Sequence, residues 1–145
     1  MELITSIRKA IDYMENHLTD NISAQDVADQ VYLSPFFLQK GFSLIKGYGL
    51  GEYIRNRRLH NAALDLKETE DKVIDIALRY CYETQESFSK AFSRFHGVTP
   101  TQAREGADVR FSSLVYQSTG SRRYPNGIQG NNNVSVQGNR ISEGI

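Results

Sequence analysis

The sequence predicts an all-α fold of about seven helices followed by a poorly ordered tail. Three observations lead to this fold class. Apolar residues recur at spacings of three and four along most of the first 105 residues, N-cap residues and glycines divide that pattern into segments, and one segment returns about fifty residues later. After Gly106 the pattern collapses, and from Gly120 onward Gly, Asn, Ser and Gln dominate without a sustained period.

Residues 3 to 18 are predicted to form the first helix, because their apolar residues share one face. These residues are Ile4, Ile7, Ile11, Met14 and Leu18. A capping-box pattern, Ser23 followed by Asp26, opens a short second helix. The inner face of this helix consists of Val27, Ala28 and Val31.

The third and fourth helices are predicted from a cap and from a long apolar pattern. Ser34 is a favourable N-cap, Pro35 suits the first helical position, and Gly47 ends the third helix. Its inner side is predicted to be Phe37, Leu38, Phe42 and Ile45. Residues 50 to 67 form a longer helix, which joins the two halves of the fold; its apolar residues lie at 50, 53, 54, 59, 62, 63 and 66.

Three shorter helices are predicted to follow. Asp71 is expected to cap the fifth helix, with Val73, Ile76, Ala77 and Tyr80 facing inward. Thr84 begins the sixth helix, and Thr99 with Pro100 begins the seventh. The sixth helix carries one apolar stripe, formed by Phe88, Phe92 and Phe95.

Composition limits the classes of protein to which the chain can belong. Lys and Arg (17) balance Asp and Glu (17), so a nucleic-acid partner has to be argued from local charge. The single cysteine, Cys81, cannot form an internal disulfide, which suits a reducing cytoplasm. Glu2, Asp12 and Glu15 interrupt the apolar residues of the first segment, so we expect neither a signal peptide nor a membrane span.

Catalytic and metal-binding functions are not expected. His17, His60 and His96 lack zinc-binding spacing, and Cys81 has no CxxC partner. No nucleophile motif and no glycine-rich phosphate loop occurs, and the helical region leaves no room for a catalytic domain. We therefore expect no cofactor, no metal and no enzymatic activity.

One helix-turn-helix unit occurs twice in the sequence. A shift of fifty residues places Leu38 on Phe88, Lys40 on Lys90, Phe42 on Phe92 and Gly47 on Gly97. Two copies of a short helix, a tight turn and a longer helix with one basic side are typical of DNA readers. Repeated helix pairs also build structural solenoids, but a solenoid would need further copies.

Two stretches carry a resemblance to a known family. They are "SAQDVADQVYLSPFFLQKGFSLIKGYGLGEYIRNRRL" and "IALRYCYETQESFSKAFSRFHGVTPTQAR". Residues 1–105 resemble the DNA-binding region of the AraC/XylS family of bacterial transcription regulators. The resemblance implies two helix-turn-helix lobes whose recognition helices face one side of the DNA, about 34 Å apart. The sequence departs from the family at Cys81, where glycine is usual, so this cysteine must avoid positive φ or accept strain.

The resemblance also assigns candidate DNA-reading residues. In the first recognition helix they are Phe36, Gln39 and Lys40, which suit a thymine methyl group, adenine, and guanine or phosphate. In the second recognition helix they are Gln85, Glu86, Ser89 and Lys90. Phe36 could instead belong to the core. Glu86 either accepts a hydrogen bond from a cytosine amino group or is only solvated.

The long helix supplies candidate phosphate contacts. Between Ser34 and His60 five basic residues stand against one acidic residue, and three of the five are Arg55, Arg57 and Arg58. These arginines either hold phosphate, which positions the lobe without reading sequence, or form a solvated helix surface. Residues 1–105 hold 13 basic and 15 acidic residues, so the acidic residues are expected away from the DNA.

These assignments predict a sequence-specific transcription factor. We expect a monomer that binds double-stranded promoter or operator DNA and activates transcription through RNA polymerase, with no membrane partner. The alternative is a protein-interaction adaptor that has lost DNA binding. Salt-dependent binding to duplex DNA would separate the two, because an adaptor does not need it.

Residues 106–145 are predicted to be a disordered tail outside the DNA-binding domain (residues 1–105). The tail is either naturally flexible or the remnant of a lost C-terminal effector-binding domain. Val109 is one of several apolar residues in it that nothing later in the chain can bury. With one permissible choice of codons for Arg122 to Gly144, the neighbouring reading frame resembles the start of a ligand-sensing GyrI-like domain. A frameshift would then have left DNA binding without ligand sensing.

Overall fold

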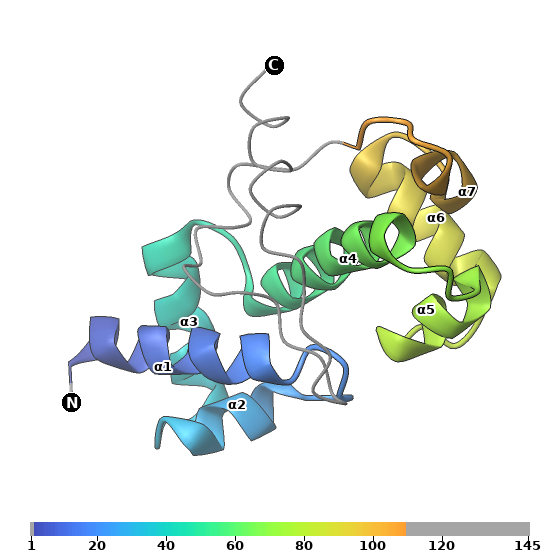
Figure 1. Ribbon diagram of the computed structural model, residues 1–145. Helices are drawn as coiled ribbons and strands as arrows, with labels where there is room; N and C mark the ends of the chain where they lie inside the picture. The colour runs from blue at the N-terminus through green and yellow to red at the C-terminus, as the bar shows by residue number, and fades with distance from the viewer. Residues whose placement is uncertain (1, 110–145) are drawn as a thin grey trace. The chain divides into compact units, whose positions relative to one another are not determined.

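The computed structural model describes residues 2–109, and all regular secondary structure in this part of the chain is α-helical (Figure 1). The helices are α1 (Leu3–Asn16), α2 (Ala24–Gln30), α3 (Pro35–Lys46), α4 (Leu50–Glu68), α5 (Val73–Arg79), α6 (Gln85–His96) and α7 (Pro100–Arg104). The predicted all-α fold is confirmed. The chain divides between Arg55 and Asn56, within α4, into two compact units, which we call the first lobe and the second lobe.

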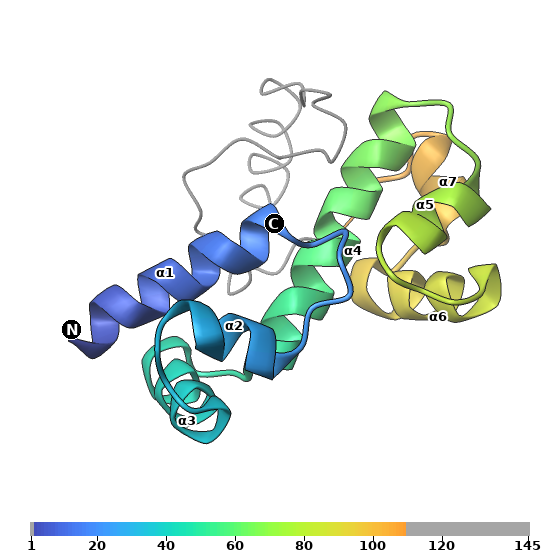
Figure 2. The same ribbon diagram turned by 90° about the horizontal axis from the view of Figure 1, so that it is seen from below.

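In the first lobe, α1, α2 and α3 contact one another in pairs (Figure 2). Its buried core also takes residues from the start of α4, and it consists of Ile7, Ala10, Met14, Leu18, Val27, Ala28, Val31, Leu38, Phe42, Leu50, Tyr53 and Ile54. α1 and α3 approach closely at Gly41, where an added Cβ would lie 2.9 Å from a methyl carbon of Leu3. Tyr53 donates a 2.6 Å hydrogen bond to Glu15, which fastens the start of α4 to α1.

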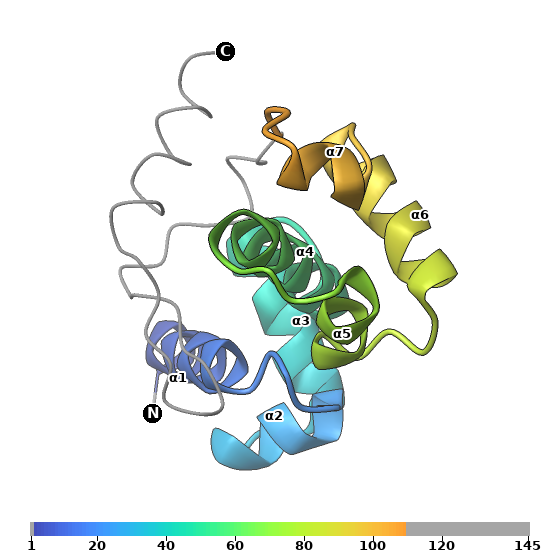
Figure 3. The same ribbon diagram turned by 45° about the vertical axis from the view of Figure 1, so that its right-hand side comes forward.

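In the second lobe, α6 contacts both α5 and α7 (Figure 3). Its core consists of Leu59, Ala62, Ala63, Leu66, Ile76, Ala77, Tyr80, Phe88, Phe92, Ala103 and Val109. Val109 is buried by residues that precede it in the chain, which the expectation about later residues did not consider. This side chain is 2% exposed, because the chain after α7 continues along the second core and does not leave it at Gly106.

The repeat extends beyond the helix-turn-helix units to the helices that support them. Buried residues of α1 and of the second half of α4 correspond at one constant offset: Ile7 with Leu59, Ala10 with Ala62, and Met14 with Leu66. The first turns of α4 therefore contribute to the core of the first lobe, and its later turns contribute to the core of the second lobe. The sequence analysis missed this correspondence, because these pairs lie 52 residues apart and not at the shift of fifty that aligns the recognition helices.

The recognition helices α3 and α6 begin and end in the same way. Ser34 and Thr84 are the N-caps, and their hydroxyls accept hydrogen bonds from the backbone N–H groups of Phe37 and Ser87. Gly47 and Gly97 end the two helices at φ 86° and 83°, in the left-handed region that glycine tolerates best. The predicted boundaries of both recognition helices are confirmed.

Two predictions about local structure are wrong. Lys72, not Asp71, occupies the N-cap position of α5, and it makes no side-chain cap; Asp71 binds Arg79 instead. Phe37 and Ile45 of α3 were expected to face inward, but they are 52% and 41% exposed. The reason is that the buried stripe of α3 is narrow and contains only Leu38, Gly41 and Phe42.

The predictions about the tail concern residues that the structure mostly does not describe. Residues 106–109 are described, and the proposed disorder of the remainder, 110–145, lies outside the described residues. The frameshift hypothesis for Arg122 to Gly144 lies outside them as well. Both remain predictions.

Candidate nucleic-acid interface

Each lobe contains a helix-turn-helix with the same turn geometry. Tyr32 in the first turn and Cys81 in the second have φ of 59° and 72°. In both turns, the next residue donates its backbone N–H to an alanine carbonyl in the preceding helix, at 3.1 Å in the first lobe and 3.0 Å in the second. Cys81 therefore accepts the strain of positive φ, which was one of the two outcomes left open by the sequence.

The outward face of α3 combines an aromatic ring, an amide and an ammonium group. Phe36 is 73% exposed, so it is not a core residue, and Gln39 and Lys40 are exposed beside it. The Lys40 Nζ lies 5.7 Å from the centre of the Phe36 ring, within the range of a cation–π interaction. This pairing presents an apolar surface and a positive charge side by side.

The outward face of α6 is polar. Gln85, Glu86 and Lys90 are exposed, whereas Ser89 is half-buried at the edge of this face. Lys90 and Glu86 form an ion pair one helical turn apart, with 3.7 Å between Nζ and Oε2. Both side chains are more than two-thirds exposed, so this pair is weak and leaves both groups available to a ligand.

Buried aromatic side chains hold each recognition helix in its lobe. In α6, Phe88 and Phe92 are 0% exposed, and their ring centres lie 5.6 Å apart. His96 at the end of this stripe is buried, with Nε2 at 2.9 Å from the carbonyl oxygen of Leu59 in α4. In α3, Phe42 packs edge-on against Tyr53, with 5.7 Å between the ring centres. The phenylalanine stripe of α6 thus faces its lobe and leaves the polar side outward.

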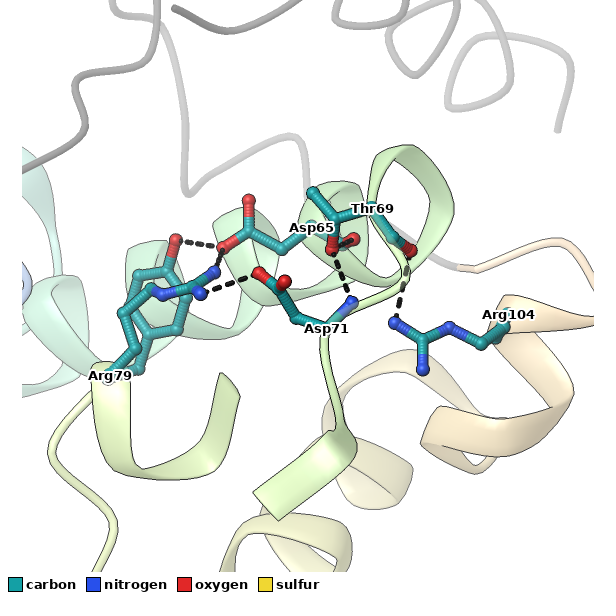
Figure 4. A network of polar contacts seen from close by, with 6 residues as sticks. Asp65, Thr69, Asp71, Arg79 and Arg104 are labelled. Carbon is teal, nitrogen blue, oxygen red and sulfur yellow. Dashed lines mark hydrogen bonds and ion pairs between the residues drawn. The ribbon is translucent and has the colours of Figure 1, made fainter. Parts of the chain in front are cut away.

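A network of charged and polar groups fastens α5 to α4 (Figure 4). Asp65 of α4 has a side chain with 0% exposure, and it accepts hydrogen bonds from Arg79 Nη1 at 2.9 Å and from the Tyr80 hydroxyl at 2.7 Å. Arg79 Nη2 also donates to Asp71 at 2.7 Å. The hydrogen bond from Arg79 lowers the pKa of Asp71. Burial of Arg79 works against its charge, but its hydrogen bonds to Asp71 and Asp65 outweigh burial and raise its pKa.

Arg104 of α7 hydrogen-bonds to backbone carbonyl groups at the end of α4. Its Nε donates to the carbonyl oxygen of Leu66 at 3.1 Å. Its Nη2 donates to the carbonyl oxygen of Thr69 at 3.2 Å (Figure 4). The Thr69 hydroxyl donates to the Asp65 carbonyl oxygen at 2.8 Å. Side chains therefore bind carbonyl groups at and just after the end of α4, and the Asp65 carbonyl also accepts the backbone N–H of Thr69 at 2.9 Å.

The three arginines of α4 differ in their surroundings. Arg55 is exposed and Arg58 is half-buried, but Arg57 is only 2% exposed. Arg57 follows the buried Tyr53 by four positions and Ile54 by three, so it shares their covered side of the helix. The interpretation of Arg57 as a phosphate contact is corrected accordingly, and it is a packing residue in this structure.

Comparisons with known proteins decide the family. A family profile described as "Helix-turn-helix domain" matches residues 27–106. The transcriptional activator AarP of Providencia stuartii is 40% identical over 109 residues, which cover 75% of this chain and 80% of AarP. The chain belongs to the AraC/XylS family. It is therefore a helix-turn-helix DNA-binding regulator of transcription, and this membership leaves the adaptor alternative without support.

Solved structures agree with this AraC/XylS membership. The C-terminal domain of AraT, a response regulator from Geobacillus stearothermophilus, superposes with a TM-score of 0.68 at 25% identity, over 87% of this chain and 99% of that domain. An AraC-type regulator from Chromobacterium violaceum superposes with the same TM-score at 24% identity, over 70% of this chain and 91% of that chain. This second likeness, at its lower identity, supports the fold alone.

Some AraC/XylS relatives are much longer than the region they share with this chain. The regulator YbfP of Bacillus subtilis is 37% identical over 66% of this chain but only 32% of its own length. The regulator Rob of Salmonella typhimurium is 34% identical over 70% of this chain and 35% of its own length. The chain thus spans about a third of these two proteins.

Sequence reasoning missed several exposed residues near the expected AraC/XylS reading faces. Leu44 is 75% exposed and follows Lys40 by four positions, so both lie on one side of α3. Arg94 is exposed and follows Lys90 by the same interval on α6. Tyr32, in the first turn, is 87% exposed. Extending each row of reading residues by one helical turn would have found Leu44 and Arg94.

The described part of the AraC/XylS domain contains neither a candidate membrane span nor a candidate metal site. Within residues 2–109 no helix is both long enough and apolar enough to cross a membrane. The same part of the chain contains no group of three His, Cys, Asp or Glu side chains placed to hold a metal ion. The outward faces of α3 and α6 therefore remain the best candidate sites among the described residues.

Proposed function

We propose that the chain reads two adjacent major-groove segments of one DNA site, with α3 in one segment and α6 in the other. The observation that carries this proposal is the duplication: each lobe has a capped recognition helix with a buried apolar stripe and an exposed face that carries a lysine. Because both readers belong to one chain, a monomer suffices for a site of about 20 base pairs.

The exposed side chains of the two helices suit different chemical groups of the DNA. Gln39 suits adenine, Lys40 and Lys90 suit guanine or phosphate, and an exposed Phe36 suits a thymine methyl group. On α6, Gln85 and Ser89 are further base-edge candidates, with Glu86 as an acceptor for a cytosine amino group.

Phosphate contacts are assigned to the exposed part of α4 and to α6. Arg55 is exposed and Arg58 half-exposed, so these two replace Arg57 in that role. Arg94 on α6 joins them, because it is exposed at the far end of the Lys90 row. Such contacts fix the register of each lobe on the DNA and carry no sequence information directly.

We further propose that the protein is an activator that contacts RNA polymerase at bacterial promoters, in the cytoplasm. The name of the 40%-identical relative AarP, a transcriptional activator, supports this part of the proposal. Transcription from a promoter that contains the selected site, measured with purified polymerase with and without the protein, tests it. Unchanged or reduced transcript would contradict the assignment as an activator.

Selection of bound fragments from a random duplex pool, followed by footprinting, tests the two-segment proposal. We expect protection of two major-groove segments about one helical turn apart, with affinity that falls steeply as salt is raised. The matched controls are Lys40→Ala and Lys90→Ala, one in each reading face, which should each weaken protection in a different segment. Protection of a single segment at saturating protein would contradict the proposal.

A further inference from the structure

The second helix-turn-helix changes direction at a strained residue. Cys81 has φ of 72°, in the left-handed region where a residue with a side chain is disfavoured. It lies between the end of α5 at Arg79 and the start of α6 at Gln85. Such a conformation persists where surrounding contacts over-determine it. The contacts on both sides of Cys81 are therefore informative.

The two residues before Cys81 are bound to one carboxylate. The Tyr80 hydroxyl and Arg79 Nη1 both donate to Asp65 Oδ2, at 2.7 Å and 2.9 Å (Figure 4). Tyr80 is the C-cap of α5, and Asp65 lies on α4 with a fully buried side chain. These directional bonds fix the last residue of α5 and its cap against α4.

After Cys81, backbone and ring contacts continue toward α6. The Cys81 N–H donates to the Leu78 carbonyl at 3.1 Å, and the Tyr82 N–H donates to the Ala77 carbonyl at 3.0 Å. The Tyr82 ring packs edge-on against Phe88 of α6, with 5.5 Å between the ring centres. Because Phe88 is fully buried, its contact with Tyr82 joins the end of the turn to the first turns of α6.

The first lobe has the same turn with a different residue before it. Tyr32 has φ of 59°, and the residue that precedes it is Val31, which is buried and apolar. Val31 has no hydroxyl or charge with which to bond a carboxylate. The polar anchor therefore is not a requirement of the turn geometry and belongs specifically to the second lobe.

We propose that Asp65 is a positioning residue for DNA recognition: it holds the turn at Cys81 in place and thereby sets the direction of α6 in the major groove. This inference rests on the proposed role of α6 as a reader. Base contacts need side chains held within about half an ångström, so a turn that relaxes should cost base discrimination. Phosphate contacts carry no base information and tolerate a small pivot better.

Two variants of the full chain test the anchor. Asp65→Asn keeps the size of the side chain and removes the charge that pairs with Arg79, while Tyr80→Phe removes one hydroxyl. Each variant is titrated with the duplex selected by the unchanged chain and with duplexes that carry one altered base pair in either segment. The α6 segment is the one in which Lys90→Ala removes base preference.

We expect Asp65→Asn to reduce discrimination in the α6 segment about tenfold, the scale of one good base contact, and to leave the α3 segment unchanged. The footprint should keep its full length. Tyr80→Phe should give a smaller loss in the same segment, and it remains informative if asparagine at position 65 unfolds the second lobe. Equal loss in both segments, or no loss in either variant, would overturn the positioning role.

A rescue experiment tests whether the anchor acts through the strained turn at Cys81. Cys81→Gly removes the strain, because glycine adopts positive φ at no steric cost. Added to Asp65→Asn or to Tyr80→Phe, it should restore most of the lost discrimination, whereas the matched change Tyr32→Gly in the first lobe should restore none. Additive effects without rescue would overturn the proposal. If the unchanged chain itself protects only one segment, the two-segment function has failed, and the positioning role falls with it.

Discussion

The two lobes share their packing and differ in the faces they present. The outward row of α3 consists of Phe36, Lys40 and Leu44, and the row at the same positions of α6 consists of Glu86, Lys90 and Arg94. Lysine is common to both rows, but its neighbours are apolar in one and charged in the other. The buried positions of the two helices coincide, with Phe42 matching Phe92 and Leu38 matching Phe88, because each lobe constrains them. The difference teaches that a duplicated scaffold can preserve its core while the outward faces of its two helices diverge.

The lobes also differ in where negative charge lies between the supporting helix (α1 or the second half of α4) and the next helix. In the first lobe, Tyr13 of α1 has a raised pKa because of burial and the negative charges of Asp26, Asp20 and Asp29. In the second lobe, the residue at the matching offset of α4 is Asp65, which pairs with a cation on α5. The carboxylates thus lie on the α2 side in one lobe and on the supporting helix in the other.

The largest expected effect comes from the matched core residues Phe42 and Phe92. Both are 0% exposed, so replacement of either by alanine should leave a cavity that costs about 3 to 5 kcal/mol. Urea unfolding of each variant measures the loss. Phe92→Ala should remove footprint protection only in the α6 segment and Phe42→Ala only in the α3 segment. If both variants lost both segments, the lobes would not be independent units.

Alanine substitutions of two α4 arginines should have different effects, because one arginine is buried and the other is exposed. Because Arg57 is 2% exposed, Arg57→Ala should destabilise the fold by about 1 to 3 kcal/mol through lost packing. Arg55→Ala should leave stability nearly unchanged and reduce the slope of log affinity against log salt by about one unit. Thermal unfolding and salt titrations measure the two effects. If Arg57→Ala instead reduced the salt slope and left stability unchanged, the interpretation of Arg57 as a phosphate contact would be supported.

The reading residues test whether the two faces recognise separate base pairs. Gln39→Ala and Lys90→Ala should each weaken binding by about 1 to 3 kcal/mol and relax base preference at different positions of the site. Repeating the fragment selection with each variant measures the preferences. Loss of preference at the same positions in both variants would contradict the assignment of one segment to each helix.

Features that depend on neighbours in sequence could be predicted, and they include most of the fold. Ser34 and Thr84 cap helices through bonds to residues three positions later, so the local pattern suffices to identify them. Asp71 was misassigned because its partner, Arg79, becomes a neighbour only when α5 folds back toward α4. A carboxylate before a helix is equally suited to capping and to an ion pair, and the sequence does not distinguish the two.

The candidate site was predictable where exposure follows from a single helix face. Gln39, Lys40 and Lys90 lie opposite buried stripes and are exposed as that geometry requires. Arg57 could not be assigned this way, because α4 contributes to both cores and much of its surface is covered. The anchoring role of Asp65 was also hidden, since an acidic residue between apolar positions gives no indication of its partner.

The smallest expected effect is a pH dependence confined to the second lobe. The hydrogen bond from Arg79 holds the pKa of Asp71 below its ordinary value of 3.8. Its contribution to stability is therefore present above that value and is lost as pH falls through the lower pKa of the folded state. The Asp71 side chain is 42% exposed, so solvent screening should keep the contribution below about 1 kcal/mol.

Amide hydrogen exchange between about pH 5 and pH 2.5 can detect this effect one lobe at a time. Relative to Asp71→Asn, the unchanged chain should lose protection in α5 as pH falls, while the amides of α2 in the first lobe should behave alike in both proteins. Added salt should reduce the difference, because an exposed ion pair is screened. If Asp71→Asn retained the full pH dependence of α5, the acid sensitivity of the second lobe would have to come from another carboxylate.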